Sequence, residues 1–215
     1  MSEHERLRRS WIANASAWTD AVREQRIESR RLVTDAAIVD AVLDQHPRTV
    51  LDLGCGEGWL ARALASHGIE VTGIDASAPL IEAARERGGG TFLVAGYESL
   101  PLPQSFDATV ANFSLLDDRT GDVLARLVGT VIVQTVHPLA AGEPYADGWR
   151  TETFAAFPGK WPESMPWYFR TKESWVNVFE SAGFRVIETR EPMHPERQVP
   201  ASLILIGRRV SPFPS

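Results

Sequence analysis

The stretch Asp52–Gly58 reads Asp-Leu-Gly-Cys-Gly-Glu-Gly and joins a predicted strand to a predicted helix. The strand is the short apolar run Thr49–Leu53, and the helix follows from Glu57 to His67. Glycines at such a turn let the backbone bend sharply and approach a ligand without a Cβ in between. The stretch therefore predicts a ligand-binding turn rather than a tight turn that serves packing alone.

The spacing of these glycines bears on the class of ligand. A nicotinamide dinucleotide site needs the spacing G-x-G-x-x-G, in which helix N–H groups hold a pyrophosphate. Here Trp59 occupies the place of the third glycine, and the carboxylates of Asp52 and Glu57 would repel a pyrophosphate. S-adenosylmethionine carries an ammonium and a sulfonium but no phosphate, so the same acidity favours it. A nicotinamide-dependent reductase on a related sheet is the alternative.

A second motif supports a nucleoside ligand. The predicted strand Ile69–Ile74 is followed directly by Asp75. In a doubly wound sheet this position faces the cleft beside the first glycine loop, where a carboxylate can accept both ribose hydroxyls. Capping of the helix that starts near Ser77 is the alternative, and it is compatible with ligand binding.

The rest of the chain continues the alternation of strands and helices. This rhythm predicts an α/β fold with a parallel sheet and helices on both faces. A length of 215 residues suits one such domain. The further strands are expected at 91–95, 107–112, 129–136, 184–190 and 202–208, and the helices at 7–22, 35–44, 77–87, near 118 and around 175–182.

Two segments together resemble a known family. Val50–Gly58, followed by Val71–Ser77, is similar to the class I S-adenosylmethionine-dependent methyltransferases that act on small molecules. The likeness is good over 48–136 and holds in outline over 172–208. It implies a doubly wound, Rossmann-like, mostly parallel seven-stranded sheet with an antiparallel last strand. It also implies S-adenosylhomocysteine as the product. The N-terminal helical extension over 1–45 is predicted from apolar periodicity and lies in a region where this family varies.

The resemblance also implies roles for single residues. Asp52, Gly54 and Gly56 would surround the methionyl group, Asp75 would bind the ribose, and Ala76 would pack on the adenine. The family often has an acid after the third strand, and here it is absent or displaced to Glu98. The full set of expected cofactor contacts is Asp52, Gly54, Cys55, Gly56, Gly58, Asp75, Ala76, Gly96, Tyr97, Glu98, Asn112 and Phe113.

Methyl transfer from a sulfonium makes modest demands on catalytic groups. The leaving group needs no acid, so alignment and desolvation supply much of the catalysis. A base is needed only for a protonated acceptor, and His137 at the end of the fifth strand is the candidate. A turn residue before Pro138 is an equally good interpretation of His137. Cys55 lies inside the glycine turn without a base near it in sequence, so we interpret it as a small filler and not as a nucleophile.

The stretch 138–169 breaks the alternation, because prolines and aromatic residues follow one another through it. It leaves the carboxyl end of the fifth strand, so it begins beside the cofactor cleft. With the N-terminal helix it is predicted to form a lid over an apolar acceptor pocket, although a satellite core would explain the aromatic residues as well. The predicted pocket residues are Trp18, Trp149, Trp167, Tyr168 and Arg170, the last with a surface salt bridge as its alternative.

Composition limits the partners. The net charge of −6 argues against nucleic acid, and no apolar run reaches the roughly 18 residues of a membrane span. The charged first residues and the single cysteine fit a cytoplasmic protein. Arginines at 23, 26, 30 and 31 interleave with glutamates, which predicts a solvated helical face; His4, His46 and His67 are predicted to lie on the surface.

The expected function is methyl transfer to a small hydrophobic or aromatic acceptor, in a monomer or homodimer without a metal. A protein that binds S-adenosylmethionine without catalysis is a second alternative. The sequence leaves open which atom of the acceptor is methylated and whether a base takes part.

Overall fold

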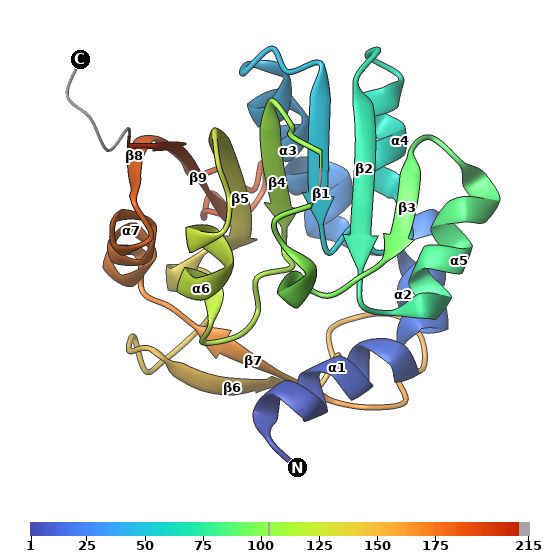
Figure 1. Ribbon diagram of the computed structural model, residues 1–215. Coiled ribbons are helices and arrows are strands. Elements are labelled where there is room, and N and C mark those ends of the chain that lie inside the picture. Colours follow the sequence, from blue (N-terminus) through green and yellow to red (C-terminus); the bar gives the residue numbers. More distant parts are fainter. Residues whose placement is uncertain (103, 211–215) are drawn as a thin grey trace.

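A seven-stranded sheet forms the centre of the computed structural model, which describes residues 1–102 and 104–210 (Figure 1). The strand order is β3-β2-β1-β4-β5-β9-β8. Strands β1 to β5 pair in parallel, and β9 runs antiparallel to both of its neighbours, β5 and β8. This confirms the predicted mostly parallel sheet with an antiparallel last strand. The strands are β1 Thr49–Leu53, β2 Glu70–Asp75, β3 Thr91–Val94, β4 Ala108–Asn112, β5 Thr130–Val136, β8 Phe184–Arg190 and β9 Ser202–Arg209.

Helices cover both faces of the sheet, as expected for parallel strands. Alternation along β1 shows the two sides, since Val50 belongs to one buried core and Leu51 to the other. The first core takes side chains from α3, α4 and α5, and the second from α6 and α7. These helices are α3 Asp35–Leu43, α4 Trp59–Ala65, α5 Ala78–Arg87, α6 Thr120–Ala125 and α7 Lys172–Ser181.

The N-terminal segment differs from the single helix predicted over 7–22. It forms two helices, α1 Glu3–Ala13 and α2 Ala15–Arg23, with a corner at Asn14. The buried Asn14 amide donates to the Glu163 carbonyl at 2.7 Å and accepts from the Glu163 N–H at 3.2 Å. This pair of bonds to a distant segment fixes the corner, which a helical period cannot show. A π-helical turn, Arg30–Thr34, leads into α3.

The aromatic stretch 138–169 is more regular than its prolines led us to expect. It holds a two-stranded antiparallel sheet, β6 Gly148–Glu152 and β7 Met165–Phe169. Both strands are edge strands, so Pro166 removes no necessary hydrogen bond. Trp149 and Tyr168 pair across the strands with ring centroids 5.6 Å apart. Strand β7 packs against α1, and both lie below the carboxyl ends of the central strands in Figure 1.

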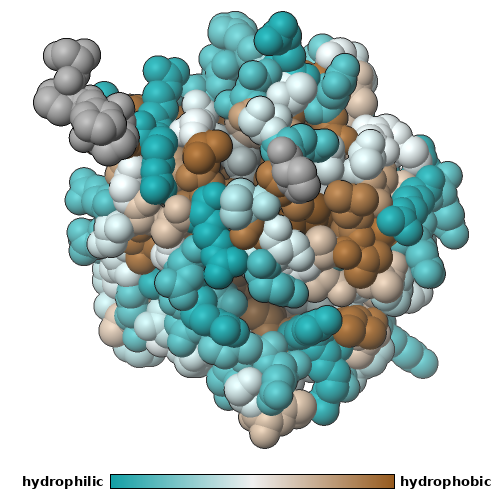
Figure 2. Space-filling model, in the orientation of Figure 1, coloured by the Kyte–Doolittle hydropathy of each residue, from teal (hydrophilic) through white to brown (hydrophobic). Residues whose placement is uncertain are grey.

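The surface seen from the same side is largely hydrophilic, with hydrophobic residues gathered towards its middle (Figure 2). None of the helices in the described part of the chain combines the length and the apolar character that crossing a bilayer would require.

Candidate functional site

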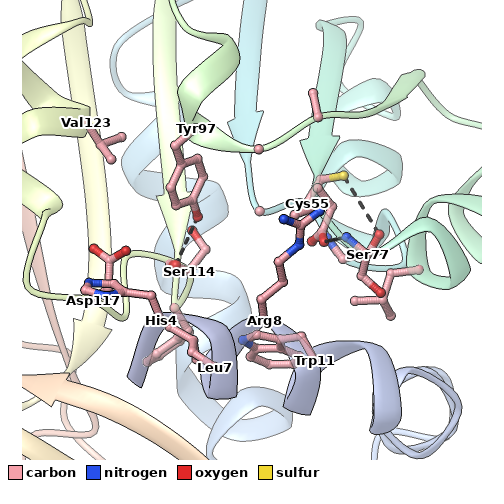
Figure 3. A pocket seen from close by; sticks show the side chains of 18 of the residues that line it. His4, Leu7, Arg8, Trp11, Cys55, Ser77, Tyr97, Ser114, Asp117 and Val123 are labelled. Atoms are coloured by element: carbon pink, nitrogen blue, oxygen red, sulfur yellow. Dashed lines mark hydrogen bonds between the residues drawn. The ribbon is translucent and has the colours of Figure 1, made fainter. Parts of the chain in front are cut away.

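A cavity of about 630 Å³ opens at the carboxyl ends of β1, β2 and β4. It lies where the strand order reverses between β1 and β4, the place at which open α/β sheets bind ligands. Its walls come from the glycine loop after β1, the end of β2, the turn after β3, the loop after β4 and the start of α6. Helix α1 closes it from below in the close-up (Figure 3).

The glycine loop contributes backbone to one wall of the cavity, because Gly54 and Gly56 have no side chains. Gly54 and Gly56 have φ values of 68° and 57°, in the left-handed region that favours glycine. A Cβ on Gly54 would lie 2.4 Å from the Ser114 Cβ, so the loop after β4 requires glycine there. The N–H groups of Gly54 and Cys55 both donate to the Ile74 carbonyl, at 2.8 and 3.0 Å, which ties the loop to β2.

Gly58 lies outside this cavity. A Cβ there would meet Phe92 at 2.8 Å and Ala84 at 3.0 Å, so the third glycine lets the start of α4 pack against α5 and β3. The structure therefore gives Gly58 a packing role, and the cofactor contact that the resemblance implied stays a prediction.

Asp75 lines the cavity at the end of β2 and also accepts a hydrogen bond at the start of α5, so the capping contact is present and ribose binding stays a prediction. Its Oδ2 accepts the Gly56 N–H at 3.0 Å, and its Oδ1 accepts the Ser77 N–H at 2.8 Å at the start of α5. Burial raises the pKa of this carboxyl, and the two backbone hydrogen bonds oppose that rise. Each oxygen keeps a lone pair for a ligand hydroxyl.

Asp52 lies behind the loop and does not line the cavity. Its side chain is buried, and its Oδ2 has no partner among the described residues. Burial, and next the charge of Asp75, raise the pKa of Asp52 to about 7. A cation bound nearby would favour the ionised carboxylate and lower that pKa.

Cys55 and Glu57 complete the loop without offering charge to a ligand. Burial, together with Asp52 and Asp75, raises the pKa of the Cys55 thiol, which therefore stays protonated. Glu57 is buried and paired, with its carboxylate 2.7 Å from Arg62 Nη2 and 3.2 Å from Arg23 Nε. The predicted repulsion between Glu57 and a pyrophosphate is thus wrong, because two arginines neutralise its charge and Glu57 is absent from the described lining.

Tyr97 connects two walls of the cavity. Its hydroxyl donates to the Ser114 carbonyl at 2.9 Å, from the turn after β3 to the loop after β4 (Figure 3). Burial raises the pKa of Tyr97, so the hydroxyl stays a neutral donor. Ala76, Gly96 and Glu98 lie beside it in the lining.

Asn112 and Phe113 line the cavity at the end of β4. Phe113 has a φ of 52°, a strained value for a bulky side chain, and its N–H donates to the Gln134 carbonyl at 2.8 Å. The Asn112 Oδ1 is buried without a partner among the described residues. Strain and an unsatisfied acceptor at one point are typical of functional sites.

Arg30 was predicted to lie on a solvated helical face, and this is wrong. The side chain is buried, and its guanidinium lies over the rings of Trp59 and Trp18, 4.6 and 5.7 Å from their centroids. Its Nε donates to Asp35 at 2.9 Å, whereas Nη2 has no partner in the described structure. Arg30 also lines the cavity. The apolar neighbours Ile27 and Val33 in sequence were the signal that this run is not uniformly solvated.

Helix α1 contributes one face to the cavity, and sequence reasoning missed most of it. His4, Leu7, Arg8 and Trp11 point into the cavity from this helix (Figure 3). The spacing of three and four residues places them on one helical face. The predicted helix begins at Leu7, so the prediction placed His4 on the surface. In the structure α1 begins at Glu3, and His4 lines the cavity.

Of the predicted pocket residues, Trp18 lines the cavity, whereas Trp149, Trp167, Tyr168 and Arg170 are not among its described lining residues. They lie one layer further out. Trp149 meets the His4 ring edge-on at 5.4 Å. Arg170 is buried, donates to the Asp118 carbonyl at 2.8 Å and lies over the Tyr168 ring. Its Nη1 is 3.9 Å from the Asp147 Oδ2, so it forms a salt bridge, although its own side chain is buried and is absent from the described cavity lining.

His137 is also absent from the described lining of the cavity. It is buried at the end of β5, where its Nδ1 accepts the Leu139 N–H at 3.3 Å and so caps the short 3₁₀ helix Pro138–Ala140. Burial lowers the pKa of His137. The turn role fits this placement, since β5 lies one strand beyond the reversal point between β1 and β4.

The polar groups around the cavity fit S-adenosylmethionine. Its ammonium needs acceptors, and Asn112, whose buried Oδ1 has no partner in the described structure, lines the cavity. Its carboxylate needs a donor, and the cavity lining includes Arg30, whose Nη2 also lacks a partner there. Its ribose needs a carboxylate at the strand end, where Asp75 lies.

Comparison with known proteins agrees with this geometry. Residues 50–131 match the family described as Methyltransferase domain. An uncharacterised methyltransferase of Mycobacterium bovis is 34% identical over 145 residues, which are 60% of this chain and 73% of that protein. One of Schizosaccharomyces pombe is 30% identical over 155 residues, 64% of this chain and 59% of that protein.

Solved structures share the fold at lower sequence identity. The 1,6-didemethyltoxoflavin-N1-methyltransferase of Burkholderia thailandensis superposes with a TM-score of 0.68 at 19% identity, covering 98% of this chain and 92% of that one. Magnesium protoporphyrin IX methyltransferase of Synechocystis gives 0.67 at 17% identity, covering 97% and 100%. Together with the sequence relatives, the glycine loop and Asp75, these matches show that the chain belongs to the class I S-adenosylmethionine-dependent methyltransferases and is an enzyme with S-adenosylmethionine as its cofactor.

Proposed function

We propose that this enzyme methylates a small hydrophobic or aromatic acceptor held between the cofactor and helix α1. The observation that carries this proposal is that one cavity holds both kinds of polar group that the cofactor needs. Asp75 and Asn112 line it with hydrogen-bond acceptors, and Arg30 lines it with a guanidinium whose Nη2 has no partner in the described structure. When bound, S-adenosylmethionine supplies an electrophilic methyl group on a sulfonium.

The polar residues fix the cofactor at three points in this proposal. Asp75 accepts the ribose hydroxyls with the lone pairs that Gly56 and Ser77 leave free. Asn112 binds the ammonium, and Arg30 binds the carboxylate through a charge-assisted hydrogen bond. Residues from Ala76 to Glu98 that line the cavity then hold the adenine.

The remaining part of the cavity suits an apolar ring. Leu7 and Trp11 reach it from α1, Val123 lies on the opposite side, and Phe113 is also among the lining residues. A closed apolar pocket excludes water and aligns the acceptor with the methyl group. The Burkholderia neighbour is named for methyl transfer to 1,6-didemethyltoxoflavin, which accords with a small acceptor.

Helix α1, backed by β6 and β7, is the cover in this proposal. Arg9 and Asn14 of the N-terminal segment bond to Glu163 in the connection between β6 and β7, at 2.9 and 2.7 Å. The predicted lid thus consists of the helix as the inner layer and the aromatic hairpin as the outer layer. Its opening would admit both substrates.

Titration calorimetry with three ligands tests the cofactor site. S-adenosylhomocysteine should bind, 5′-methylthioadenosine should bind more weakly because it lacks the amino-acid group, and NADH should not bind. Tight binding of NADH instead would favour the reductase. Transfer of labelled methyl groups from S-adenosylmethionine to a panel of phenols and nitrogen heterocycles tests catalysis. Binding of S-adenosylhomocysteine without transfer to any member of the panel would favour the non-catalytic alternative.

A further inference from the structure

His4 and Asp118 form a pair at the end of the cavity that lies away from the ribose site. The His4 Nε2 is 2.7 Å from the Asp118 Oδ1, across 114 residues of sequence. His4 lines the cavity from α1, beside Leu7 and opposite Asp117 and Val123 (Figure 3). The pair therefore lies in the part of the cavity that the proposed cofactor contacts leave to the acceptor.

The carboxylate of Asp118 sets the tautomer of the imidazole. An ionised carboxylate only accepts hydrogen bonds, so the Nε2 of His4 must carry the proton that this bond uses. Nδ1 then holds the lone pair of the neutral ring. The described structure shows no protein partner for Nδ1. A histidine oriented by a carboxylate through one nitrogen, with the other nitrogen unprotonated, has the arrangement of a general base.

The surroundings hold the ring in place. Trp149 of β6 packs edge-on against it at 5.4 Å, and Arg170 donates at 2.8 Å to the backbone carbonyl of the same Asp118. The side chain of His4 is only 29% exposed. The other charged groups around it are Glu5 and Arg8 on its own helix and Asp117, Arg119 and Asp122 from the loop and helix opposite.

Asp117 is the other candidate base at this end, and it is less suited. Its Oδ1 already accepts the Arg119 N–H at 3.0 Å. Burial raises the pKa of its carboxyl, and this backbone bond opposes the rise. An ionised Asp117 would add negative charge near His4 and stabilise an imidazolium formed there.

We propose that His4 is the base that deprotonates the acceptor, and that the acceptor is an aromatic compound whose nucleophilic atom carries a proton, such as a phenol. This rests on the proposed methyl transfer. As the acceptor oxygen forms its bond to the methyl carbon, the sulfur–methyl bond breaks and its electron pair stays on sulfur. The proton of the hydroxyl passes to His4 Nδ1, and Asp118 stabilises the resulting imidazolium. Asp118 and Trp149 are positioning residues.

A chromogenic phenol tests this without turnover. We suggest titrating 4-nitrophenol into the protein saturated with S-adenosylhomocysteine, at a pH below the pKa of the free phenol, and measuring the phenolate absorbance. Wild type should bind the probe and convert part of it to phenolate. His4→Gln should bind it without phenolate, and Asp118→Asn should give less phenolate than wild type. His67→Gln, an exposed histidine after α4, is the matched control and should behave as wild type.

Labelled methyl transfer to 4-nitrophenol gives the second readout. His4→Gln should lower kcat about 10²- to 10⁴-fold near neutral pH, the range for loss of a general base. The loss should shrink as the pH rises and the phenol ionises unaided, which a merely structural role of His4 would not produce. Trp149→Leu, which loosens the ring but keeps the base, should retain most of the pH dependence.

The outcomes separate the two proposals. Failure of wild type to bind S-adenosylhomocysteine would defeat the proposed cofactor site, whatever His4 does. Normal binding of S-adenosylhomocysteine with no binding of 4-nitrophenol would overturn the acceptor class. Phenolate formation in His4→Gln equal to that in wild type, or a loss of activity that stays constant with pH, would overturn the role of His4.

Discussion

Replacing Arg30 by methionine would test the orientation of the cofactor most directly. Methionine keeps an unbranched apolar side chain at this position, but it removes the guanidinium, which lies over Trp59 and whose Nη2 has no partner in the described structure. If Arg30 binds the cofactor carboxylate, the variant loses one or two charge-assisted hydrogen bonds. Each contributes about 1.5–3 kcal/mol, so the affinity for S-adenosylhomocysteine should fall about ten- to several-hundred-fold.

The assay compares two ligands in two proteins. 5′-Methylthioadenosine has the adenine and ribose but no amino-acid carboxylate, so its affinity should change less than about twofold on Arg30→Met. The difference between the two losses isolates the contact, as in a double-mutant cycle. Titration calorimetry measures all four affinities, and thermal unfolding reports whether the variant remains folded.

Arg30→Met also breaks the 2.9 Å bond between Arg30 and Asp35. Asp35→Asn is therefore the matched control, because it weakens that bond while keeping the guanidinium. It should leave the affinity for S-adenosylhomocysteine nearly unchanged. Equal losses for both ligands, or no loss for either, would show that Arg30 stabilises the fold and does not bind the carboxylate.

Four further perturbations have defined expected outcomes. Asp75→Asn should weaken binding of S-adenosylhomocysteine about ten- to several-hundred-fold by calorimetry, because a carboxylate accepts two ribose hydroxyls better than an amide does; unchanged affinity would remove Asp75 from the site. Gly56→Val should abolish binding in a folded protein, since φ is 57° and a Cβ at this position would lie 3.6 Å from Trp18 Nε1; retained binding would reduce the loop to a turn. The pKa of Asp52 is raised from 3.8 to about 7, so between these values the native state binds more protons than the unfolded chain. The free energy of unfolding should therefore fall as pH rises from 4 to 7. A denaturation series in which the Asp52→Asn variant keeps the same dependence on pH over this range would contradict the assignment. His137→Gln should leave the pH profile of methyl transfer unchanged, because His137 is absent from the described cavity lining, and an altered profile would restore its catalytic role.

The sequence alone determined the sheet and the centre of the candidate site. Glycines at 54 and 56 and the acid at 75 each follow a short apolar strand. Because parallel strands end at one edge, residues just after them meet there whatever the details of packing. Along the chain, segments in which apolar residues recur every two residues alternate with segments in which they recur every three to four. This pattern also predicted both helical layers, because the spacing of apolar residues shows which side of a strand or helix is buried. Local pattern was sufficient for these features.

Tertiary structure decided which side chains complete the site. The approach of α1 to the cavity depends on the Asn14–Glu163 bonds and, through α2, on the pair of Arg23 with the buried Glu57. These contacts join segments 149 and 34 residues apart, so no local period reveals them. They bring His4 into the cavity from a helix that begins near the first residue. The local sequence pattern thus specifies the edge of the sheet at which a ligand binds. Contacts between distant segments determine which face of α1 meets that edge.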